Sequence, residues 1–273
     1  MEGGGATVPL TDLQRELLAL LASSRASDSY LAGGTALHLS PASHRFSEDI
    51  DFFHDSIEAV AESYARDSAV LEAAGYRVQV HLSQPGFIRA MVESGDQETT
   101  RIDWAHDSAW RFMPLVRLDN GGLVLHEVDL ATNKVLALAG RDEPRDFVDI
   151  LYAHENILPL GALIWAAVAK DPGFSPASLL EQLKRRGRYQ PQEIDRLVLA
   201  APVDLVKTKA AWRAALAKAG EFILERPHEE AGCLYYSPCN DCFVAPSSEF
   251  PLEKQGLVRH FGQPGGILPR VAD

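Results

Sequence analysis

The sequence predicts an α+β fold in which a strand-rich first half is followed by a mainly helical second half. Short runs with alternating or continuous apolar residues, typical of strands, occur at 30–32, 49–53, 76–82, 87–93, 99–104 and 123–126. From residue 128 onward, apolar residues recur at helical spacing, at 128–139, 146–154, 160–168, 176–185 and 203–224. We therefore expect a core domain at 1–127, a helical domain at 128–230, and a hairpin with an irregular tail at 231–273.

Helices are also expected among the strands, at 11–22, 35–39 and 57–74. The first has apolar residues at i, i+4, i+7 and i+8 from Leu13, and Thr11 can cap it. Gly75 supplies the left-handed residue that ends the third helix. The turn residues at 94–96 lie between two strand runs, so we expect those runs to form a hairpin.

The composition indicates a protein with a buried core and an acidic surface. Of its 273 residues, 46% are hydrophobic, and no run approaches the roughly 20 apolar residues of a membrane helix. We therefore expect no membrane partner. The net charge of −12 disfavours non-specific binding to nucleic acid. A local basic site remains open at 184–188, although a solvated helix end is the simpler interpretation.

The cysteines are few and lie late in the chain. Cys233, Cys239 and Cys242 form no disulfide framework, and a reducing cytoplasm is the simplest compartment. With His228 upstream they leave a Cys₃His zinc site open. The segment also fits a hairpin with its turn at 237–241 and free thiols, which is the interpretation we favour.

The acidic residues at 49–51 are the strongest functional signal. Residues i and i+2 of a strand project from one face, so Asp49 and Asp51 point the same way, while Ile50 and Phe52 face the core. Neighbouring like charges repel and are usually neutralised by a cation. Carboxylate oxygens suit Mg²⁺ or Mn²⁺. The alternative is a strand edge kept soluble by charge.

A diglycine turn precedes these acids. Gly33 and Gly34 follow the strand at 30–32 and let the backbone come close to a bound group. The helix start that follows offers N–H groups to phosphate, and Thr35 adds a hydroxyl donor. This order of elements would place a triphosphate donor beside metal ligands.

These segments resemble the DNA polymerase β-type nucleotidyltransferase superfamily and, more narrowly, the AbiEii/AbiGii toxin family. The resemblance covers residues 31–151 and includes Gly-Gly-Thr-Ala-Leu at 33–37 and Arg-x-Ser-x-Asp-x-Asp-Phe-Phe at 45–53. It continues with Lys-Val-Leu-Ala-Leu-Ala-Gly-Arg at 134–141 and Arg-Asp-Phe-Val-Asp at 145–149. The resemblance implies a nucleotidyltransferase-type mixed β-sheet with flanking helices, followed by a mainly helical C-terminal domain. It also implies that Asp49 and Asp51 bind the metal and that residues 33–35 hold the nucleotide phosphates.

The resemblance implies roles for three more residues, each with a structural alternative. Lys134 would contact the triphosphate, although a lysine on an apolar helix ordinarily reaches for solvent. Asp146 would be a further essential acid, but acids also favour a helix start. Superfamily members often use a third carboxylate from an adjacent strand as metal ligand and base. Asp103 is the candidate, and an ion pair with Arg101 is its alternative.

Two polar residues before the acids have open roles. Arg45 could contact phosphate or pair with Glu48, and Ser47 could bind nucleotide or orient the acidic loop.

The resemblance implies a toxin-like enzyme that moves a nucleoside monophosphate from NTP to an acceptor hydroxyl. In some family members the acceptor is the 3′ end of tRNA, so tRNA or another RNA and a cognate antitoxin are expected partners. One alternative is transfer to a small molecule, such as an aminoglycoside, or to a protein. Another is a non-catalytic nucleotide-binding module of the same fold.

Overall fold

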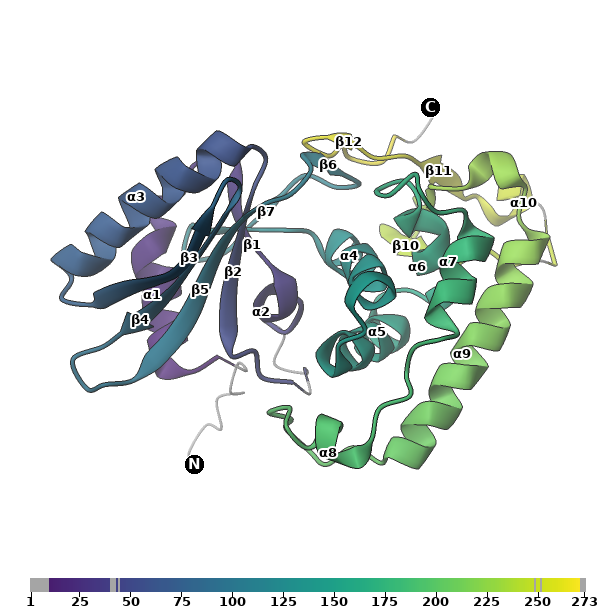
Figure 1. Ribbon diagram of the computed structural model, residues 1–273. Coiled ribbons are helices and arrows are strands. Elements are labelled where there is room, and N and C mark those ends of the chain that lie inside the picture. Colours follow the sequence, from purple (N-terminus) through teal and green to yellow (C-terminus); the bar gives the residue numbers. More distant parts are fainter. Residues whose placement is uncertain (1–9, 40–42, 44, 248, 251, 271–273) are drawn as a thin grey trace, which may run out of the picture. The chain divides into compact units, whose positions relative to one another are not determined.

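The computed structural model describes residues 10–39, 43, 45–247, 249–250 and 252–270, which form two compact units (Figure 1). The first unit comprises the chain up to Ala109 together with Leu115–His126 and Val198–Ala201. The second comprises Trp110–Pro114, Glu127–Leu197 and the chain from Pro202 onward. The chain therefore passes between the units more than once.

A mixed, seven-stranded sheet forms the centre of the first unit, with the order β3-β4-β5-β2-β1-β8-β7. The pairs β2–β5 and β1–β8 are parallel, and the other neighbours are antiparallel. The mixed sheet with flanking helices confirms the predicted fold class, and β4–β5 is the predicted hairpin. The strands are β1 (Ser29–Ala32), β2 (Asp49–His54), β3 (Arg77–Gln84), β4 (Phe87–Glu93), β5 (Thr99–His106), β7 (Val116–Arg117) and β8 (Leu123–Val124).

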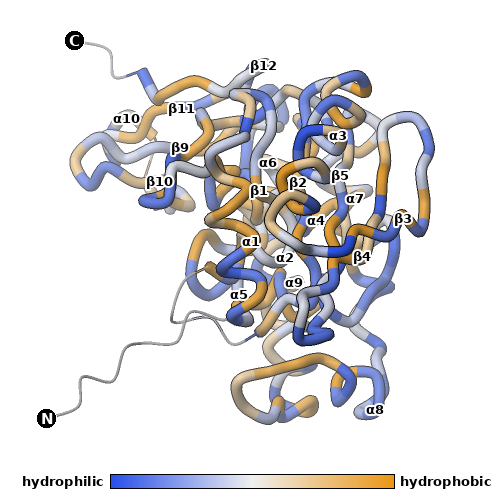
Figure 2. The backbone as a smooth tube through the Cα atoms, turned by 90° about the vertical axis from the view of Figure 1, so that its left-hand side faces the viewer, coloured by the Kyte–Doolittle hydropathy of each residue, from blue (hydrophilic) through white to orange (hydrophobic). Residues whose placement is uncertain are grey.

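Helices α1 (Asp12–Ala22) and α3 (Ile57–Ala73) cover one face of this sheet (Figure 1). Ile50 and Phe52 of β2 and Ile102 and Trp104 of β5 point into that layer and are at most 3% exposed. Figure 2 shows orange tube, which marks hydrophobic residues, around β1, and every residue of β1 is buried. Burying each such side chain contributes about 1.5–3 kcal/mol, so the apolar face fixes which residues of β2 point outward.

A buried polar network joins α3 to the sheet. Asp67 of α3 pairs with Arg25 and accepts a hydrogen bond of 2.6 Å from the Trp104 indole nitrogen. His54 is fully buried beside this network, with Nε2 3.0 Å from the Ser29 hydroxyl oxygen. Burial lowers the pKa of His54 to about 4, because a charged imidazole would lose its hydration there.

Helices dominate the second unit. Among the described residues these are α4 (Glu127–Arg141), α5 (Pro144–Asn156), α6 (Leu160–Ala167), α7 (Pro176–Leu183), α8 (Pro191–Ile194), α9 (Leu205–Glu225) and α10 (Leu252–Gln255). Every residue of α6 is buried, and this helix packs against α4 and α9. No single helix in the described ranges is long and apolar enough to cross a membrane; α5 and α6 pass that test only together and bend by 112°.

The predicted C-terminal hairpin is present as β9 (Leu234–Ser237) and β10 (Cys242–Val244). The tail expected to be irregular adds β11 (Val258–His260), which pairs with β9, and β12 (Gln263–Pro264), which pairs with β6 (Trp110–Arg111). The cysteines are free: Cys233 is buried and the other two are exposed. Burial raises the pKa of the Cys233 thiol to about 12. Among the described residues, no group of three or more His, Cys, Asp or Glu side chains is placed to hold a metal ion, so the three cysteines and His228 form no zinc site there.

The depressed pKa of His54 makes stability depend on pH. The unfolded chain takes up a proton near pH 6.5 and the folded chain only near pH 4, so stability is full above pH 6.5 and falls as the pH drops to about 4. We expect His54 alone to contribute a loss of about 2 kcal/mol between pH 7 and pH 5. Urea unfolding at the two pH values measures it, and His54→Asn should reduce this difference.

His228→Asn is the matched control, because His228 is fully exposed. Its pH dependence should equal that of the wild type. An unchanged pH dependence in His54→Asn would contradict the role given to His54.

Candidate active site

Asp49 and Asp51 lie on β2 and project from the face opposite the apolar layer, as predicted. Ile50 and Phe52 alternate with them and are 0% and 3% exposed. The carboxylate of Asp51 lies directly against Gly33, where a Cβ atom would come within 2.6 Å of Asp51 Cγ. The diglycine turn and the second acid of the Asp-x-Asp pair are therefore in contact.

Both glycines are needed at the turn. Gly33 has φ = 64°, a conformation that residues with side chains rarely adopt, and any side chain there would displace the Asp51 carboxylate. A Cβ atom at Gly34 would overlap the Arg45 guanidinium and lie 3.1 Å from the Ser47 hydroxyl. The short helix α2 (Gly33–Leu37) starts at the diglycine itself, not at Thr35 as the sequence suggested.

Hydroxyl groups fix the start of β2. The Thr35 hydroxyl, for which the sequence suggested a phosphate contact, donates to the backbone carbonyl of Asp49, and Ser47 donates to the same oxygen over 3.2 Å. Arg45 is buried beside Gly34 and donates to the Phe46 carbonyl at 3.3 Å. The three side chains thus connect the diglycine turn, the loop and the first acid.

A distant segment holds this loop in place. Arg45 forms a β-bridge with Leu199, and the Phe46 N–H donates to the Val198 carbonyl over 2.9 Å. Residues 198–201 belong to the first unit for this reason, although their neighbours in sequence belong to the second. No local sequence pattern predicts this pairing.

Asp103 lies on β5 directly opposite Asp51 in the parallel β2–β5 pair, so the two side chains share a face. Arg89 of β4 donates to both Asp103 oxygens, at 2.8 and 2.6 Å. Arg101 pairs with Asp49, and its Nε is 3.7 Å from Asp103 Oδ1. The sequence left an ion pair with Arg101 open as the alternative role of Asp103; Asp103 instead pairs mainly with Arg89. The pKa of Arg89 is raised by its hydrogen bonds to Asp103.

The donor chemistry of this face suits Mg²⁺ or Mn²⁺. Within the described part of the chain, no group of three or more His, Cys, Asp or Glu side chains is arranged to hold an ion by itself. Mg²⁺ is commonly bound by one or two carboxylates together with substrate phosphates. Asp49 and Asp51 fit such a shared site, because Asp51 faces the turn where phosphates would lie.

Lys134 and Asp146 come together in the second unit. Lys134 Nζ of α4 lies 2.7 Å from Asp149 Oδ2 and 3.2 Å from Asp146 Oδ1 of α5. Arg141 adds contacts of 2.6 and 2.9 Å to Asp146. Lys134 is only 7% exposed and does not reach for solvent. Burial alone would raise the pKa of Asp146, but the hydrogen bond from Arg141 and the charge of Lys134 outweigh it, and the pKa is lowered.

The residues proposed from the sequence thus form two clusters. The first unit brings together Gly33, Gly34, Thr35, Arg45, Ser47, Asp49, Asp51 and Asp103. The second unit joins Lys134 to Asp146. Sequence reasoning gave no role to Arg89, and its spacing from Asp103 becomes informative only with the β4–β5 register.

Comparisons with known proteins identify a family and a shared fold. The family described as nucleotidyl transferase AbiEii toxin, type IV toxin–antitoxin system, matches residues 15–231. JHP933 from Helicobacter pylori shares 19% identity and a TM-score of 0.53, covering 81% of this chain and 97% of its own. MenT4, a nucleotidyltransferase toxin from Mycobacterium tuberculosis H37Rv, shares 19% identity and a TM-score of 0.52, covering 81% and 85%.

At this identity the two solved structures show a common fold, whereas the family match spans most of the chain. Curated protein sequences give no significant match. The chain belongs to the AbiEii nucleotidyltransferase toxin family and is a nucleotidyltransferase.

Proposed function

We propose that this protein transfers a nucleoside monophosphate from NTP to the 3′ hydroxyl of an RNA such as tRNA, with Mg²⁺ or Mn²⁺ bound at Asp49 and Asp51. The observation that carries the proposal is the contact between the Asp51 carboxylate and Gly33, with Asp49 on the same face. Membership in a toxin–antitoxin family implies an NTP substrate and a cognate antitoxin. It also supports an enzyme over the non-catalytic module.

In the reaction, the acceptor oxygen forms a bond to the α-phosphorus, and the bond from that phosphorus to the bridging oxygen breaks to release pyrophosphate. The divalent ion would polarise the phosphoryl group and stabilise the leaving pyrophosphate. Asp49 and Asp51 would hold it, and the turn at Gly33 and Gly34 lets phosphate oxygens approach the backbone. Asp103 is the candidate base and a further candidate metal ligand, and Arg89 donates to both of its oxygens.

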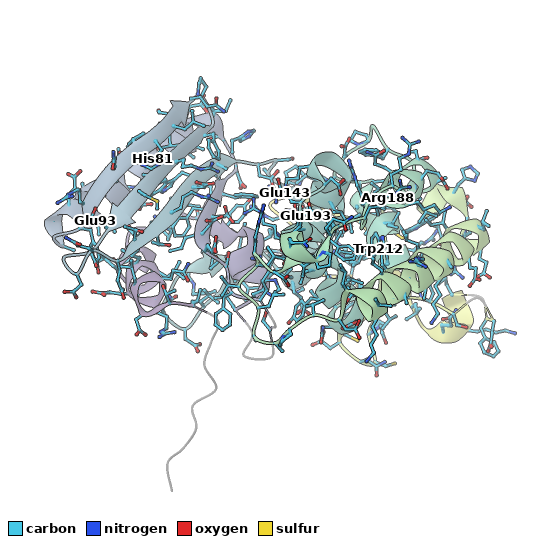
Figure 3. The ribbon with its side chains drawn as sticks, turned by 60° about the horizontal axis from the view of Figure 1, so that its bottom comes forward. His81, Glu93, Glu143, Arg188, Glu193 and Trp212 are labelled. Carbon is cyan, nitrogen blue, oxygen red and sulfur yellow. The ribbon has the colours of Figure 1, made fainter. Side chains whose placement is uncertain are left out.

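An RNA acceptor requires a restricted cationic surface, because the whole chain carries −12. The basic run at 184–188 follows the end of α7, and its Arg185 and Arg188 side chains are exposed. Gly187 has φ = 79°, and a Cβ atom there would come within 2.8 Å of the Trp212 ring of α9, so this position requires glycine (Figure 3 labels Arg188 and Trp212). Small-molecule and protein acceptors use the same donor site, and a screen of acceptors separates them.

Loss of either acid of β2 should abolish transfer. We expect Asp49→Ala and Asp51→Asn to reduce labelling of total RNA by radiolabelled NTP and Mg²⁺ by more than about a hundredfold, since even residues behind metal ligands cost 10–100-fold. Asp96→Asn, on the exposed β4–β5 turn, removes the same charge and should label normally. Equal labelling by wild type and Asp49→Ala would refute the proposal, as would no labelling by wild type.

Gly33→Ala tests the contact that carries the proposal. The added Cβ atom would displace the Asp51 carboxylate, and a displacement near 1 Å costs roughly a hundredfold in rate. Gly95→Ala is the matched control, since its Cβ atom meets nothing within 4 Å. We expect NMP transfer to fall only in Gly33→Ala, with both proteins folded by circular dichroism. Full activity in Gly33→Ala would argue against a nucleotide at this turn.

Lys134 is proposed to contact the triphosphate, and its buried pairing also gives it a structural part. Lys134→Met leaves Asp146 and Asp149 facing each other without their shared cation. We expect the free energy of unfolding in urea to fall by about 3–5 kcal/mol. Lys134→Met combined with Asp149→Asn should recover part of that loss. Unchanged stability in the single variant would show that the buried pairs contribute nothing.

A further inference from the structure

Two arginines lie among the carboxylates on the sheet face opposite α1 and α3. Arg89 donates to both oxygens of Asp103, at 2.8 and 2.6 Å, and Arg101 pairs with Asp49. These carboxylates are the groups that the proposed function assigns to the divalent ion and to the base. A guanidinium and a divalent cation are attracted to the same carboxylate oxygens, so the two compete for them.

We propose that Arg89 and Arg101 are internal counter-ions that compete with the divalent ion for Asp103 and Asp49, so that ion and NTP bind cooperatively. The inference rests on the proposed function and adds a regulation of the same site. Phosphate oxygens are strong alternative partners for a guanidinium group. A triphosphate therefore draws the arginines from the carboxylates and frees these oxygens for the ion. By thermodynamic linkage, the ion increases the affinity for NTP by the same factor.

The exposure of the arginines allows this exchange of partners. The Arg89 and Arg101 side chains are 35% and 30% exposed, whereas Asp103 and Asp49 are 7% and 10% exposed. The charged ends can thus turn towards solvent or phosphate while the carboxylates stay fixed on the sheet. Arg89 also lies over the Phe87 ring, 5.2 Å from its centroid, and this cation–π contact is a further partner for its guanidinium group.

A second arginine–aspartate pair in the same unit shows the opposite design. Arg25 and Asp67 are 3% and 1% exposed, and Arg25 lies 3.9 Å from the Phe52 ring centroid. Separating this pair would leave charges buried without partners, which costs several kcal/mol. The arginines beside the acids of β2 and β5 are thus about ten times more exposed than Arg25, and exchanging their partners does not require burying an unpaired guanidinium.

Binding of Mn²⁺ to the full chain, measured by electron paramagnetic resonance of the free ion, tests the proposal without relying on activity. Without nucleotide, we expect Arg101→Gln to bind Mn²⁺ about tenfold more tightly than wild type, because one positive charge beside a partly exposed site is lost. Adding an NTP analogue with a non-hydrolysable α–β bond should tighten Mn²⁺ binding strongly in wild type and less in Arg101→Gln. Arg89→Gln should change in the same direction.

Arg77→Gln is the matched control. Arg77 is 75% exposed and pairs with Glu93 at 3.3 Å, at the β3 edge of the same sheet (Figure 3 labels Glu93). Its Mn²⁺ affinity should equal that of wild type. Arg101→Lys keeps the charge but loses the planar fork, so its Mn²⁺ affinity should lie between those of wild type and Arg101→Gln. This variant also serves as the test if Arg101→Gln does not fold.

The outcomes separate the two proposals. Normal Mn²⁺ binding by wild type with the analogue, together with unchanged or weaker binding by folded Arg101→Gln, overturns the counter-ion role and leaves the proposed function intact. Absence of Mn²⁺ binding by wild type, even with the analogue, overturns the metal dependence on which both proposals rest. Tighter binding by Arg101→Gln with a reduced effect of the analogue supports the counter-ions.

Discussion

The site depends on the alternation of apolar and acidic residues along β2. Ile50 and Phe52 are buried against the helical layer, and the strand pairs on both sides, with β1 and β5. A shift of one residue would turn Asp49 and Asp51 into that layer, where unpaired carboxylates cost many kcal/mol. Hydrophobic burial on one face therefore fixes the acids on the other, before any ligand contributes.

This constraint creates an electrostatic problem, because three carboxylates then share one face of two neighbouring strands. The fold resolves it with side chains from the adjoining strand β4 and from β5 itself: Arg89 and Arg101 lie within hydrogen-bonding reach of Asp103 and Asp49. The Thr35 and Ser47 hydroxyls donate to the backbone carbonyl of Asp49, whereas Arg101 and Arg89 pair with the side chains of Asp49 and Asp103. The positions of the acids are thus set by packing, while their charges are balanced by partners that are able to move.

Much of the fold could be predicted from local patterns. Period-two alternation identified β2, a turn signal identified the β4–β5 hairpin, and helical spacing identified α4 to α7 and α9. The pairing of Arg89 with Asp103 could not be predicted, because it depends on the β4–β5 register. The bridge between Arg45 and Leu199 joins residues far apart in sequence, and the pairing of β6 with β12 has the same character. Local sequence carries no record of such contacts.

The two clusters pair their carboxylates with cations of different exposure: Lys134 is buried, whereas Arg89 and Arg101 are about one-third exposed. In the second unit, Lys134 is shared between Asp146 and Asp149, and both carboxylates are fully buried. Breaking that arrangement would strand a buried charge, so it is suited to hold a fixed geometry. In the first unit the arginines are about one-third exposed, and water or phosphate can replace the carboxylate as their partner. A change of partners on nucleotide binding is therefore expected for Arg89 and Arg101 at the sheet face and not for Lys134, which is buried between α4 and α5.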